Sequence, residues 1–344
     1  MLSILNSPSK DIGIDLGTAN TLFYLKNKGI VLDEPSVLAM RDSARGARKV
    51  VAAGRKARDM LGKTPDSIIV KQPLRDGVIS DFEAATTMLK RFLAGIQYNK
   101  IFTRKLRIVI SAPYDITPIE RRAVREVAES AGKSEVYLIE EPMAAAIGAG
   151  LPITEPAGSM IVDIGSGITE VAVISLSGIV YCYSVRIAGE KIDEAIVNYI
   201  KRKHNLLIGE QTAEKVKIAV GSAYLDSDDT EQTIEINGRS LVDGIPRPLN
   251  ISSYEVREAI AEPIHSIIDA IRIALERMPP ELASDVIDTG IILSGGGSLL
   301  RRLDLLIEKV TRVPVHIADN PLTAVAEGAG RALDELALLK EISS

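Results

Sequence analysis

A repeated pattern constrains the fold of this 344-residue chain more than any other feature. Residues 12–24 and 160–172 each read as an apolar run, a small polar turn and a second apolar run. The two copies align at two key positions, Asp15 with Asp163 and Gly17 with Gly165. Two apolar runs joined by a glycine-containing turn are typical of a β-hairpin. The repeat therefore predicts two copies of one α/β unit, at roughly residues 10–155 and 156–330.

A second repeated pattern follows each hairpin. Residues 108–113 and 291–296 are apolar runs that end in small residues, which is typical of buried strands. Each run is followed by a helical stretch and then by an apolar helix that begins near a proline, Pro142 or Pro321. The period is far too long for a solenoid array. A duplicated fold with a cleft between its halves is the better interpretation.

The two halves also contain segments that do not repeat. We expect one inserted subdomain in each half, and we expect the helical pattern of the tail to pack back on the first half. The predicted division is a first core at 10–33 and 75–155 with the tail 331–344, a first insertion at 34–74, a second core at 156–188 and 246–330, and a second insertion at 189–245.

Composition excludes several classes of protein. The 41 Lys and Arg against 46 Asp and Glu give a net charge of −5, which disfavours a nucleic-acid-binding protein. Cys182 is the single cysteine, so a disulfide framework and a cysteine zinc site are excluded. His204, His265 and His316 lack metal-ligand spacing. No apolar run approaches the ~18 residues of a membrane span, and a signal-peptide pattern is absent. We expect a soluble cytoplasmic protein.

Both repeated turns carry residue types that suit a phosphate and a hydrated metal ion. Residues 15–20 read Asp-Leu-Gly-Thr-Ala-Asn, and residues 163–170 read Asp-Ile-Gly-Ser-Gly-Ile-Thr-Glu. A carboxylate at a strand end can hold hydrated Mg²⁺, while the backbone N–H groups of a tight turn face a phosphate. One such turn is also found in ordinary hairpins. Two in register across a duplication can clamp one phosphate chain.

Two other features could take part in nucleotide chemistry. Residues 294–299, Ser-Gly-Gly-Gly-Ser-Leu, form a glycine turn between a buried strand and a helix, which suits an anion or a nucleotide. Tight strand–helix packing is the alternative. The pair Glu140 and Glu141 precedes Pro142 at the start of an alanine-rich helix. A carboxylate there either stabilises the helix N-terminus or orients a water for attack on a γ-phosphate.

Several segments of the chain resemble the MreB family of bacterial actin homologues. The resemblance is carried by residues 15–21, 29–36, 75–82, 140–148, 279–285 and 294–301. It separates this family from the wider actin, sugar-kinase and heat-shock-chaperone superfamily, which shares only the phosphate turns and the glycine turn. The resemblance implies an α/β, duplicated actin-like fold of the ribonuclease-H-like type, with two lobes around a nucleotide cleft and an inserted subdomain in each.

The resemblance also implies roles for individual residues toward ATP or ADP. Asp15 and Asp163 would hold Mg²⁺ through water, and Glu141 would position the hydrolytic water. The phosphates would be surrounded by Gly17, Thr18, Ala19, Asn20, Gly165, Ser166, Gly167 and Thr169. The nucleoside would contact Glu214, Lys217, Gly295, Gly296, Gly297 and Ser298.

The second turn departs from the pattern of most family members at Ser166 and Ile168, where they have glycine and threonine. Ile168 removes a hydroxyl that could touch the phosphates. Ser166 adds a Cβ where backbone freedom matters. Both aspartates and two glycines of the turns remain, so we expect nucleotide binding to be kept and the hydrolysis rate to be altered.

The resemblance further implies contact with the inner face of the cell membrane. The candidate anchors are an apolar start and an apolar pair in a basic segment: Met1, Leu2, Ile4, Leu5, Ile101 and Phe102. The pair is flanked by cations, as in an interfacial anchor on anionic lipid. A frayed terminus and an inward-folded phenylalanine are the alternatives. Each anchor alone would be weak, and polymerisation would strengthen binding by avidity.

The function expected from the resemblance is an ATP-dependent, membrane-associated filament that organises cell-wall synthesis and maintains rod shape, with slow ATP hydrolysis. Its partners would be further copies of the chain, head to tail and paired antiparallel, an anionic membrane surface, and shape proteins of the RodZ, MreC and MreD types, with no nucleic acid. The alternatives are an ATP-gated chaperone lobe and a small-molecule kinase. A kinase needs an additional aspartate base, and only Asp15 and Asp163 stand in such turns.

Overall fold

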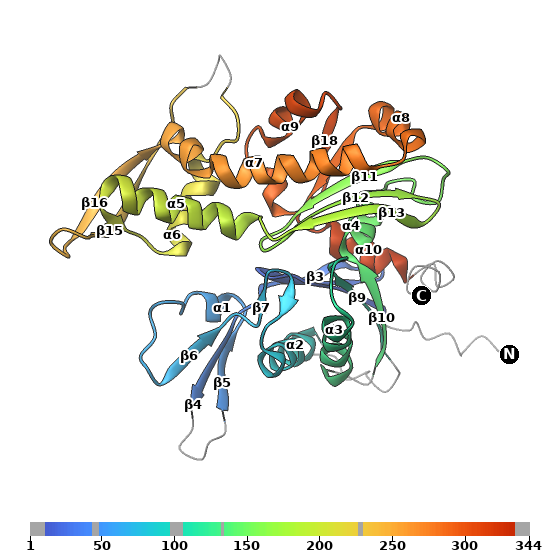
Figure 1. Ribbon diagram of the computed structural model, residues 1–344. Coiled ribbons are helices and arrows are strands. Elements are labelled where there is room, and N and C mark those ends of the chain that lie inside the picture. The colour runs from blue at the N-terminus through green and yellow to red at the C-terminus, as the bar shows by residue number, and fades with distance from the viewer. Residues whose placement is uncertain (1–10, 43–47, 97–105, 132–133, 226–229, 334–344) are drawn as a thin grey trace. The chain divides into compact units, whose positions relative to one another are not determined.

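The structure is a computed structural model that describes residues 11–42, 48–96, 106–131, 134–225 and 230–333. The chain divides into two compact units (Figure 1). Unit 1 comprises residues 1–155 and 323–344, and unit 2 comprises residues 156–322.

Unit 1 is built on a five-stranded sheet in the order β10-β9-β1-β2-β3. Its strands are β1 (Asp11–Leu16), β2 (Asn20–Leu25), β3 (Gly29–Pro35), β9 (Leu106–Ala112) and β10 (Ser134–Glu140). β1 runs antiparallel to β2 and parallel to β9. The hairpin predicted around the first repeated turn is therefore confirmed.

Helices cover both faces of this sheet (Figure 1). The helices are α2 (Phe82–Ile96), α3 (Pro118–Ala131), α4 (Glu141–Gly148) and α10 (Ala324–Ala332). Side chains of α2 and α3 form one apolar core with Ile12, Ile14 and Leu16 of β1. On the other face α10 comes so close that a Cβ at Gly13 would lie 2.4 Å from the nitrogen of Gly330. Alternation along β1 thus places branched side chains toward one helix pair and glycine toward the other.

The position of α10 corrects the predicted second core, which extended to residue 330. The helix packs against α4 and the sheet of unit 1, and it belongs to that unit. A Cβ at Gly328 would lie 1.8 Å from the carbonyl oxygen of Ala144, and one at Gly148 would lie 1.9 Å from that of Ala324. Only glycine allows two helix backbones to approach so closely.

The predicted first insertion forms a sheet of its own, in the order β5-β4-β6. Its elements are β4 (Leu38–Asp42), β5 (Arg48–Ala53), α1 (Arg55–Arg58) and β6 (Ile68–Lys71). A two-stranded hairpin of β7 (Leu74–Arg75) and β8 (Val78–Ile79) follows it. The turn of this hairpin is Asp76-Gly77, and both residues have positive φ angles, 49° and 78°. Asp-Gly is a preferred sequence for such a two-residue turn.

Unit 2 repeats the arrangement with a sheet in the order β13-β12-β11-β17-β18. Its strands are β11 (Ser159–Ile164), β12 (Thr169–Ser175), β13 (Gly178–Val185), β17 (Ile291–Ser294) and β18 (Val315–Ile317). β11 runs antiparallel to β12 and parallel to β17, as β1 does with β2 and β9. The duplicated α/β fold predicted from the sequence is confirmed.

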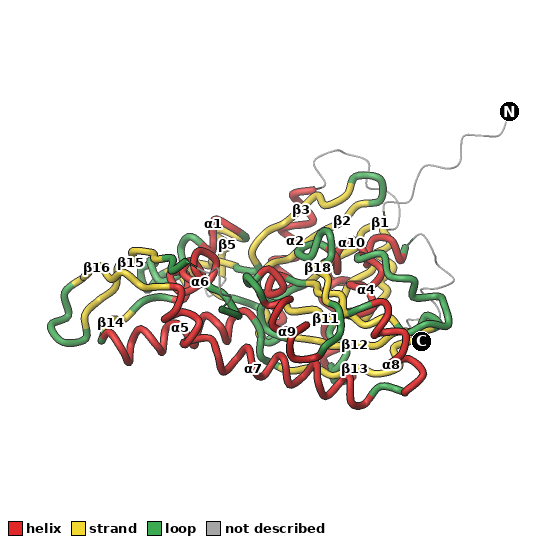
Figure 2. The backbone as a smooth tube through the Cα atoms, turned by 90° about the horizontal axis from the view of Figure 1, so that it is seen from above, coloured by secondary structure: helices red, strands yellow, loops and turns green. Residues whose placement is uncertain are grey.

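The core of unit 2 lies between this sheet and its helices. They are α5 (Gly189–His204), α6 (Glu210–Val220), α7 (Ser253–Arg277), α8 (Pro280–Thr289) and α9 (Leu303–Thr311), with a 3₁₀ turn η1 (Gly296–Leu299). α7 runs along β12 and β13 in both views (Figures 1 and 2). It starts with a capping box, in which Ser252 and Glu255 bond each other's backbone N–H groups.

A small sheet in the order β14-β15-β16 accompanies α5 and α6. Its strands are β14 (Leu206–Leu207), β15 (Thr233–Ser240) and β16 (Pro246–Ser252). The predicted end of the second insertion, residue 245, is therefore wrong. β16 pairs with β15 along its length, so the sheet of the insertion continues to Ser252.

Within the described ranges, no helix is both long and apolar enough to cross a membrane. The candidate anchors Met1, Leu2, Ile4, Leu5, Ile101 and Phe102 lie outside the described residues, as does residue 334 onward of the predicted tail helix.

Candidate functional site

The first predicted phosphate turn joins β1 to β2. Asp15 lies near the end of β1, and the hydroxyl of Ser111 donates to its Oδ1 at 3.2 Å. A Cβ at Gly17 would lie 2.7 Å from the carbonyl oxygen of Asn20, so the turn is too tight for a side chain there. Ser36 donates to the carbonyl oxygen of Gly17 at 2.7 Å. The side chain of Ser36 thus holds the turn from outside.

Thr18 links this turn to the β7–β8 hairpin. Its buried hydroxyl accepts a hydrogen bond from the backbone N–H of Gly77 at 2.9 Å. Two other residues of the turn bond beyond it: the Asn20 side chain donates to Asp33 at 2.7 Å, and the Ala19 carbonyl accepts from the Ser36 N–H at 2.8 Å. The Thr18 hydroxyl only accepts in this bond, so its own proton is still available to donate to another group.

The second predicted phosphate turn joins β11 to β12 and is closed by its own backbone. The N–H of Gly165 donates to the carbonyl oxygen of Ile168 at 3.0 Å. The N–H of Gly189, at the start of α5, donates to the carbonyl oxygen of Gly165 at 3.2 Å. Gly167 is buried in the turn. The hydroxyl of Thr169, another residue predicted for the nucleotide site, donates to the carbonyl oxygen of Ile187 at 2.7 Å.

Ser166 is accommodated in this turn without backbone strain, because its φ angle is not in the positive region. Its hydroxyl donates to Glu190 Oε1 at 3.0 Å, and the N–H of Glu190 donates to the carbonyl oxygen of Ser166 at 2.8 Å. The added side chain therefore ties the turn to the first residues of α5, a bond that glycine could not make.

Asp163 is a buried acid of the candidate site whose pKa is raised. Its side chain is buried, and within the described residues its Oδ1 has no hydrogen-bond partner. Burial raises the pKa of Asp163 to about 6, and the hydroxyl of Ser294 opposes that shift. An unpaired buried carboxylate is costly in a protein interior. Such a group fits a site that receives a cation.

The donor set fits Mg²⁺ held through water. Carboxylate oxygens are suitable ligands, and Mg²⁺ usually keeps several waters and binds phosphate oxygens as well. Across the part of the chain that the structure describes, no cluster of three or more His, Cys, Asp or Glu could cage a metal directly. The residues present therefore suit a hydrated ion that arrives with a phosphate ligand.

Two serines of the site were not predicted from the sequence. Ser111 lies in β9 beside Asp15, and Ser294 ends β17 as the register partner of Asp163. They occupy equivalent places in the two units. The signal was available, because each serine follows the apolar run of the second repeated pattern.

Lys217 and Glu214 both lie on α6. The Lys217 ammonium donates to Asp193 Oδ2 at 2.8 Å and to the carbonyl oxygen of Gly189 at 3.1 Å. Burial raises the pKa of Asp193 to about 6, against the opposing effect of Lys217. Asp193 was not predicted, because a pair formed between two helices leaves no local pattern in the sequence.

The two glutamates before Pro142 have different surroundings. Glu140 accepts a hydrogen bond from the guanidinium of Arg121 at 3.3 Å. Glu141 is the first residue of α4, and it is only 8% exposed. A buried carboxylate at a helix N-terminus is favoured by the helix dipole. The two glutamates thus differ in burial and in their position on α4, since Glu140 is the N-cap and Glu141 the first helical residue.

The glycine turn at 295–297 is explained in part by packing. Gly295 has a φ angle of 78°, and a Cβ there would lie 2.3 Å from the carbonyl oxygen of Ile164. A Cβ at Gly297 would lie 2.3 Å from Ile164 Cγ2, while Gly296 is less crowded. The hydroxyl of Ser298 donates back to the carbonyl oxygen of Gly295 at 2.6 Å. Close approach to β11 thus requires two of the three glycines.

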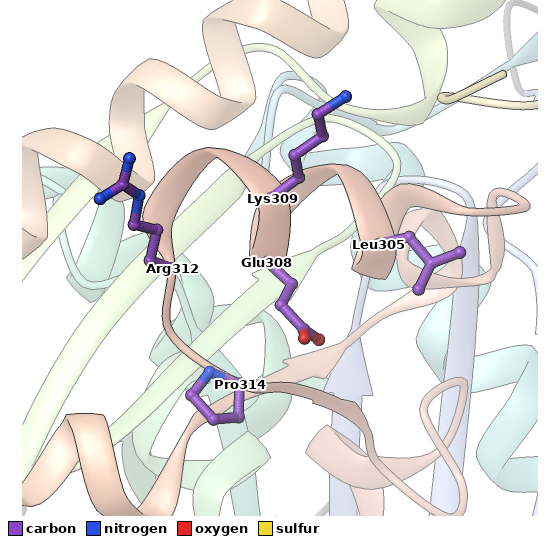
Figure 3. Close-up of a pocket in the computed structure, with 5 residues that line it drawn as sticks. All are labelled: Leu305, Glu308, Lys309, Arg312 and Pro314. Carbon is purple, nitrogen blue, oxygen red and sulfur yellow. The ribbon is translucent and has the colours of Figure 1, made fainter. Parts of the chain in front are cut away.

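A pocket of about 350 Å³ beside α9 is separate from these residues. It is lined by Leu305, Glu308, Lys309, Arg312 and Pro314 (Figure 3). Figure 3 shows Glu308 and Lys309 extending from opposite sides of α9, and the Lys309 ammonium donates to the Tyr224 hydroxyl at 2.8 Å. None of the predicted nucleotide residues lines this pocket, so it is not the candidate site.

Two units with the same sheet, each carrying an aspartate and a tight turn at the same place, define an actin-like protein. The structure of MreB5 of Spiroplasma citri bound to ADP matches with a TM-score of 0.88 and 37% identity, over 97% of this chain and 98% of that chain. A MamK double helical filament matches with a TM-score of 0.77 and 22% identity, over 95% of this chain and 99% of that chain, which supports the fold alone.

The chain belongs to the MreB/Mbl protein family, whose model matches residues 9–341. The cell shape-determining protein MreB of Escherichia coli (strain K12) is 52% identical over 327 residues, which cover 95% of this chain and 94% of that protein. The cell shape-determining protein Mbl of Bacillus subtilis (strain 168) is 48% identical over 328 residues, which cover 95% of this chain and 97% of that protein. The resemblance predicted from the sequence is confirmed.

Proposed function

We propose that this chain is an ATP-dependent cytoskeletal filament protein that determines cell shape. One observation carries the proposal: both units of a chain in the MreB/Mbl family repeat an aspartate, a tight glycine turn and a serine beside the aspartate. The buried, unpaired Oδ1 of Asp163 supports a cation at this place. The family match gives no support to the alternative of a small-molecule kinase.

Both phosphate turns contribute to the binding of Mg-ATP in this proposal. Bound Mg²⁺ neutralises phosphate charge. Asp15 and Asp163 would hold the hydrated ion, and Ser111, which donates to Asp15 Oδ1 at 3.2 Å, would orient that carboxylate. The backbone N–H groups of the turns bind phosphate oxygens. Structures of the related MreB5 of Spiroplasma citri were determined bound to ADP and to AMPPNP, which supports a nucleotide ligand here.

Glu141 acts on water in this proposal. A carboxylate at the start of α4 accepts a hydrogen bond from the water and orients it toward the terminal phosphate. Slow hydrolysis that serves the polymer rather than metabolism follows from family membership. Ile168 stands where most of the family has threonine, and this difference is expected to alter the hydrolysis rate. The nucleotide state then determines how strongly the copies associate.

The filament itself is proposed by analogy with relatives. Head-to-tail association with antiparallel pairing, peripheral attachment to the inner membrane face through residues 1–5 and 101–102, and partners of the RodZ, MreC and MreD types follow from family membership.

Electron microscopy on an anionic lipid monolayer tests the proposal. The purified chain is incubated with Mg-ATP or Mg-ADP, without any phosphate acceptor. Filaments on lipid with Mg-ATP are expected. Monomers alone at concentrations well above micromolar, or ATP consumption that requires an added hydroxyl compound, would contradict the proposed function and favour the kinase.

A glutamate variant tests the proposed hydrolytic role. Glu141→Gln is expected to bind ATP as the wild type does and to lose phosphate release by about 100-fold, the range of an acid–base contribution. Glu140→Gln is the matched control, because its carboxylate is paired with Arg121. Equal phosphate release by Glu141→Gln and the wild type would move the role to another residue.

A further inference from the structure

Asp193 on α5 and Lys217 on α6 form an ion pair that the proposed phosphate binding does not use. The two atoms, Lys217 Nζ and Asp193 Oδ2, are 2.8 Å apart, and the side chains are 18% and 14% exposed. The other carboxylate oxygen, Asp193 Oδ1, is buried with no hydrogen-bond partner among the residues described. Removing a pair of charges from water often costs more than their attraction returns. Stability alone therefore explains this pair poorly.

The ion pair lies directly beside the second phosphate turn. Lys217 also donates to the carbonyl oxygen of Gly189, whose own N–H donates to the carbonyl oxygen of Gly165. A Cβ built at Gly189 would lie 3.5 Å from Lys217 Nζ, 3.5 Å from Ser166 Cα and 3.4 Å from the oxygen of Gly165. The ammonium, the turn and the start of α5 thus converge on a residue without a side chain.

The charges around Asp193 also indicate that it serves to hold the Lys217 ammonium in place. Asp193 faces Glu190 and Glu214, and both carboxylates work against its ionisation, whereas Lys217 favours it. A lysine carries its charge on a flexible four-carbon stem, and a free ammonium would sample many positions. The carboxylate of Asp193 limits that freedom, which lowers the entropic cost of binding a ligand.

We infer that Asp193 is a positioning residue of the nucleotide site, which holds the Lys217 ammonium beside the second phosphate turn so that it binds oxygen atoms of the nucleotide. This inference rests on the proposed nucleotide binding. Lys217 is the group that meets the ligand, and Asp193 acts through it.

A matched control exists on the same helix. Lys191 and Glu194 of α5 form an ion pair of the same length, 2.8 Å, but their side chains are 51% and 58% exposed. An exposed pair of this kind contributes little to stability. Variants of Lys191 and Glu194 therefore show how the loss of an ion pair on α5 affects nucleotide affinity when the pair lies outside the nucleotide site.

The test is a double-mutant cycle read out as the affinity for Mg-ADP by isothermal titration calorimetry. Asp193→Asn and Lys217→Met are each expected to weaken binding by about tenfold, since a charge-assisted hydrogen bond is lost or misplaced. The double variant is expected to bind no more weakly than Lys217→Met alone, because Asp193 acts through the ammonium. Glu194→Gln and Lys191→Met are expected to bind as the wild type does.

Two results would overturn the inference. Unchanged affinity in a folded Asp193→Asn variant would remove its role, and additive losses in the double variant would show that Asp193 does not act through Lys217. A wild-type chain that fails to bind Mg-ADP would refute the proposed function first and the inference with it. If Asp193→Asn does not fold, Asp193→Glu keeps the charge and shifts the carboxylate by one methylene. Weaker ADP binding is then expected, and equal affinity would overturn the inference.

Discussion

Replacing Asp163 with asparagine is expected to stabilise the nucleotide-free chain and to weaken nucleotide binding. The wild-type residue is 5% exposed, and its Oδ1 makes no hydrogen bond within the described residues. Burial raises its pKa to about 6, from an ordinary value of 3.8. The charged form is therefore a cost in the folded state, and the variant removes the charge without changing the shape of the side chain.

The size of the gain follows from the pKa. The difference between 3.8 and about 6 corresponds to up to about 3 kcal/mol at neutral pH. The amide of asparagine has to be buried too, and its unpaired hydrogens offset part of the gain. We expect a net stabilisation of about 1–3 kcal/mol. For unit 2, residues 156–322, each kcal/mol of added stability raises the melting temperature by roughly 2–4 °C.

The pH dependence has a definite sign. Above pH 6 the carboxylate of Asp163 is charged in both the folded and the unfolded chain, so the full cost is present. As the pH falls through about 6 the folded chain takes up the proton first, and the cost is relieved. The relief is complete below about 4, where the unfolded chain is protonated as well. The stability difference between Asp163→Asn and the wild type is therefore expected to shrink from pH 7.5 to pH 5.

Urea and thermal unfolding without nucleotide, repeated with Mg-ADP, measure these effects. Asp285→Asn is the control, because Asp285 Oδ2 already accepts a hydrogen bond from the N–H of Gly158 at 2.7 Å. This control is expected to lose stability. A lower melting temperature for nucleotide-free Asp163→Asn, or a gain from Mg-ADP equal to that of the wild type, would refute the reasoning.

Two further substitutions test the packing around the candidate site. Gly328→Ala is expected to destabilise the chain by several kcal/mol in urea unfolding, since its Cβ would lie 1.8 Å from a carbonyl oxygen of α4. Gly95→Ala is the control and is expected to be neutral or stabilising, because a Cβ at Gly95 would meet no atom within 4 Å. Thr18→Ala is expected to cost about 1 kcal/mol, because the partly buried N–H of Gly77 loses its acceptor, and Thr18→Ser is expected to keep most of the stability. Equal stability within either pair would contradict the corresponding contact.

The sequence predicts the duplicated hairpins because their signals are local. Apolar runs, an aspartate and a glycine turn all lie within about a dozen residues, and β1 with β2 and β11 with β12 pair as expected. The assignment of α10 could not be predicted in this way. Its small residues suit close packing on any partner, and only the matching Gly148 of α4 makes unit 1 the partner.

For the candidate site, too, the sequence predicts the residues with a local signal and misses those that depend on contacts between distant segments. Asp15 and Asp163 stand out because the repeat places them in register. Lys217 was predicted from family resemblance, but its bond to Asp193 joins two helices across 24 residues and has no period that a sequence pattern could detect. The end of the second insertion was missed for a related reason, since the pairing of β16 with β15 depends on a contact between strands rather than on composition.

The two phosphate turns have similar sequences and different surroundings, and the difference follows the parts of the chain that do not repeat. The first turn is bonded to Ser36, near the start of the first insertion, and to Gly77, in the β7–β8 hairpin that follows the insertion. The second turn is bonded to Gly189 and Glu190, which begin the predicted second insertion. A ligand that binds the backbone N–H groups of either turn therefore binds close to the hydrogen bonds that join this turn to the non-repeated segments. Each insertion therefore has a direct hydrogen-bonded connection to the candidate site of its own unit, which the repeated residues alone would not reveal.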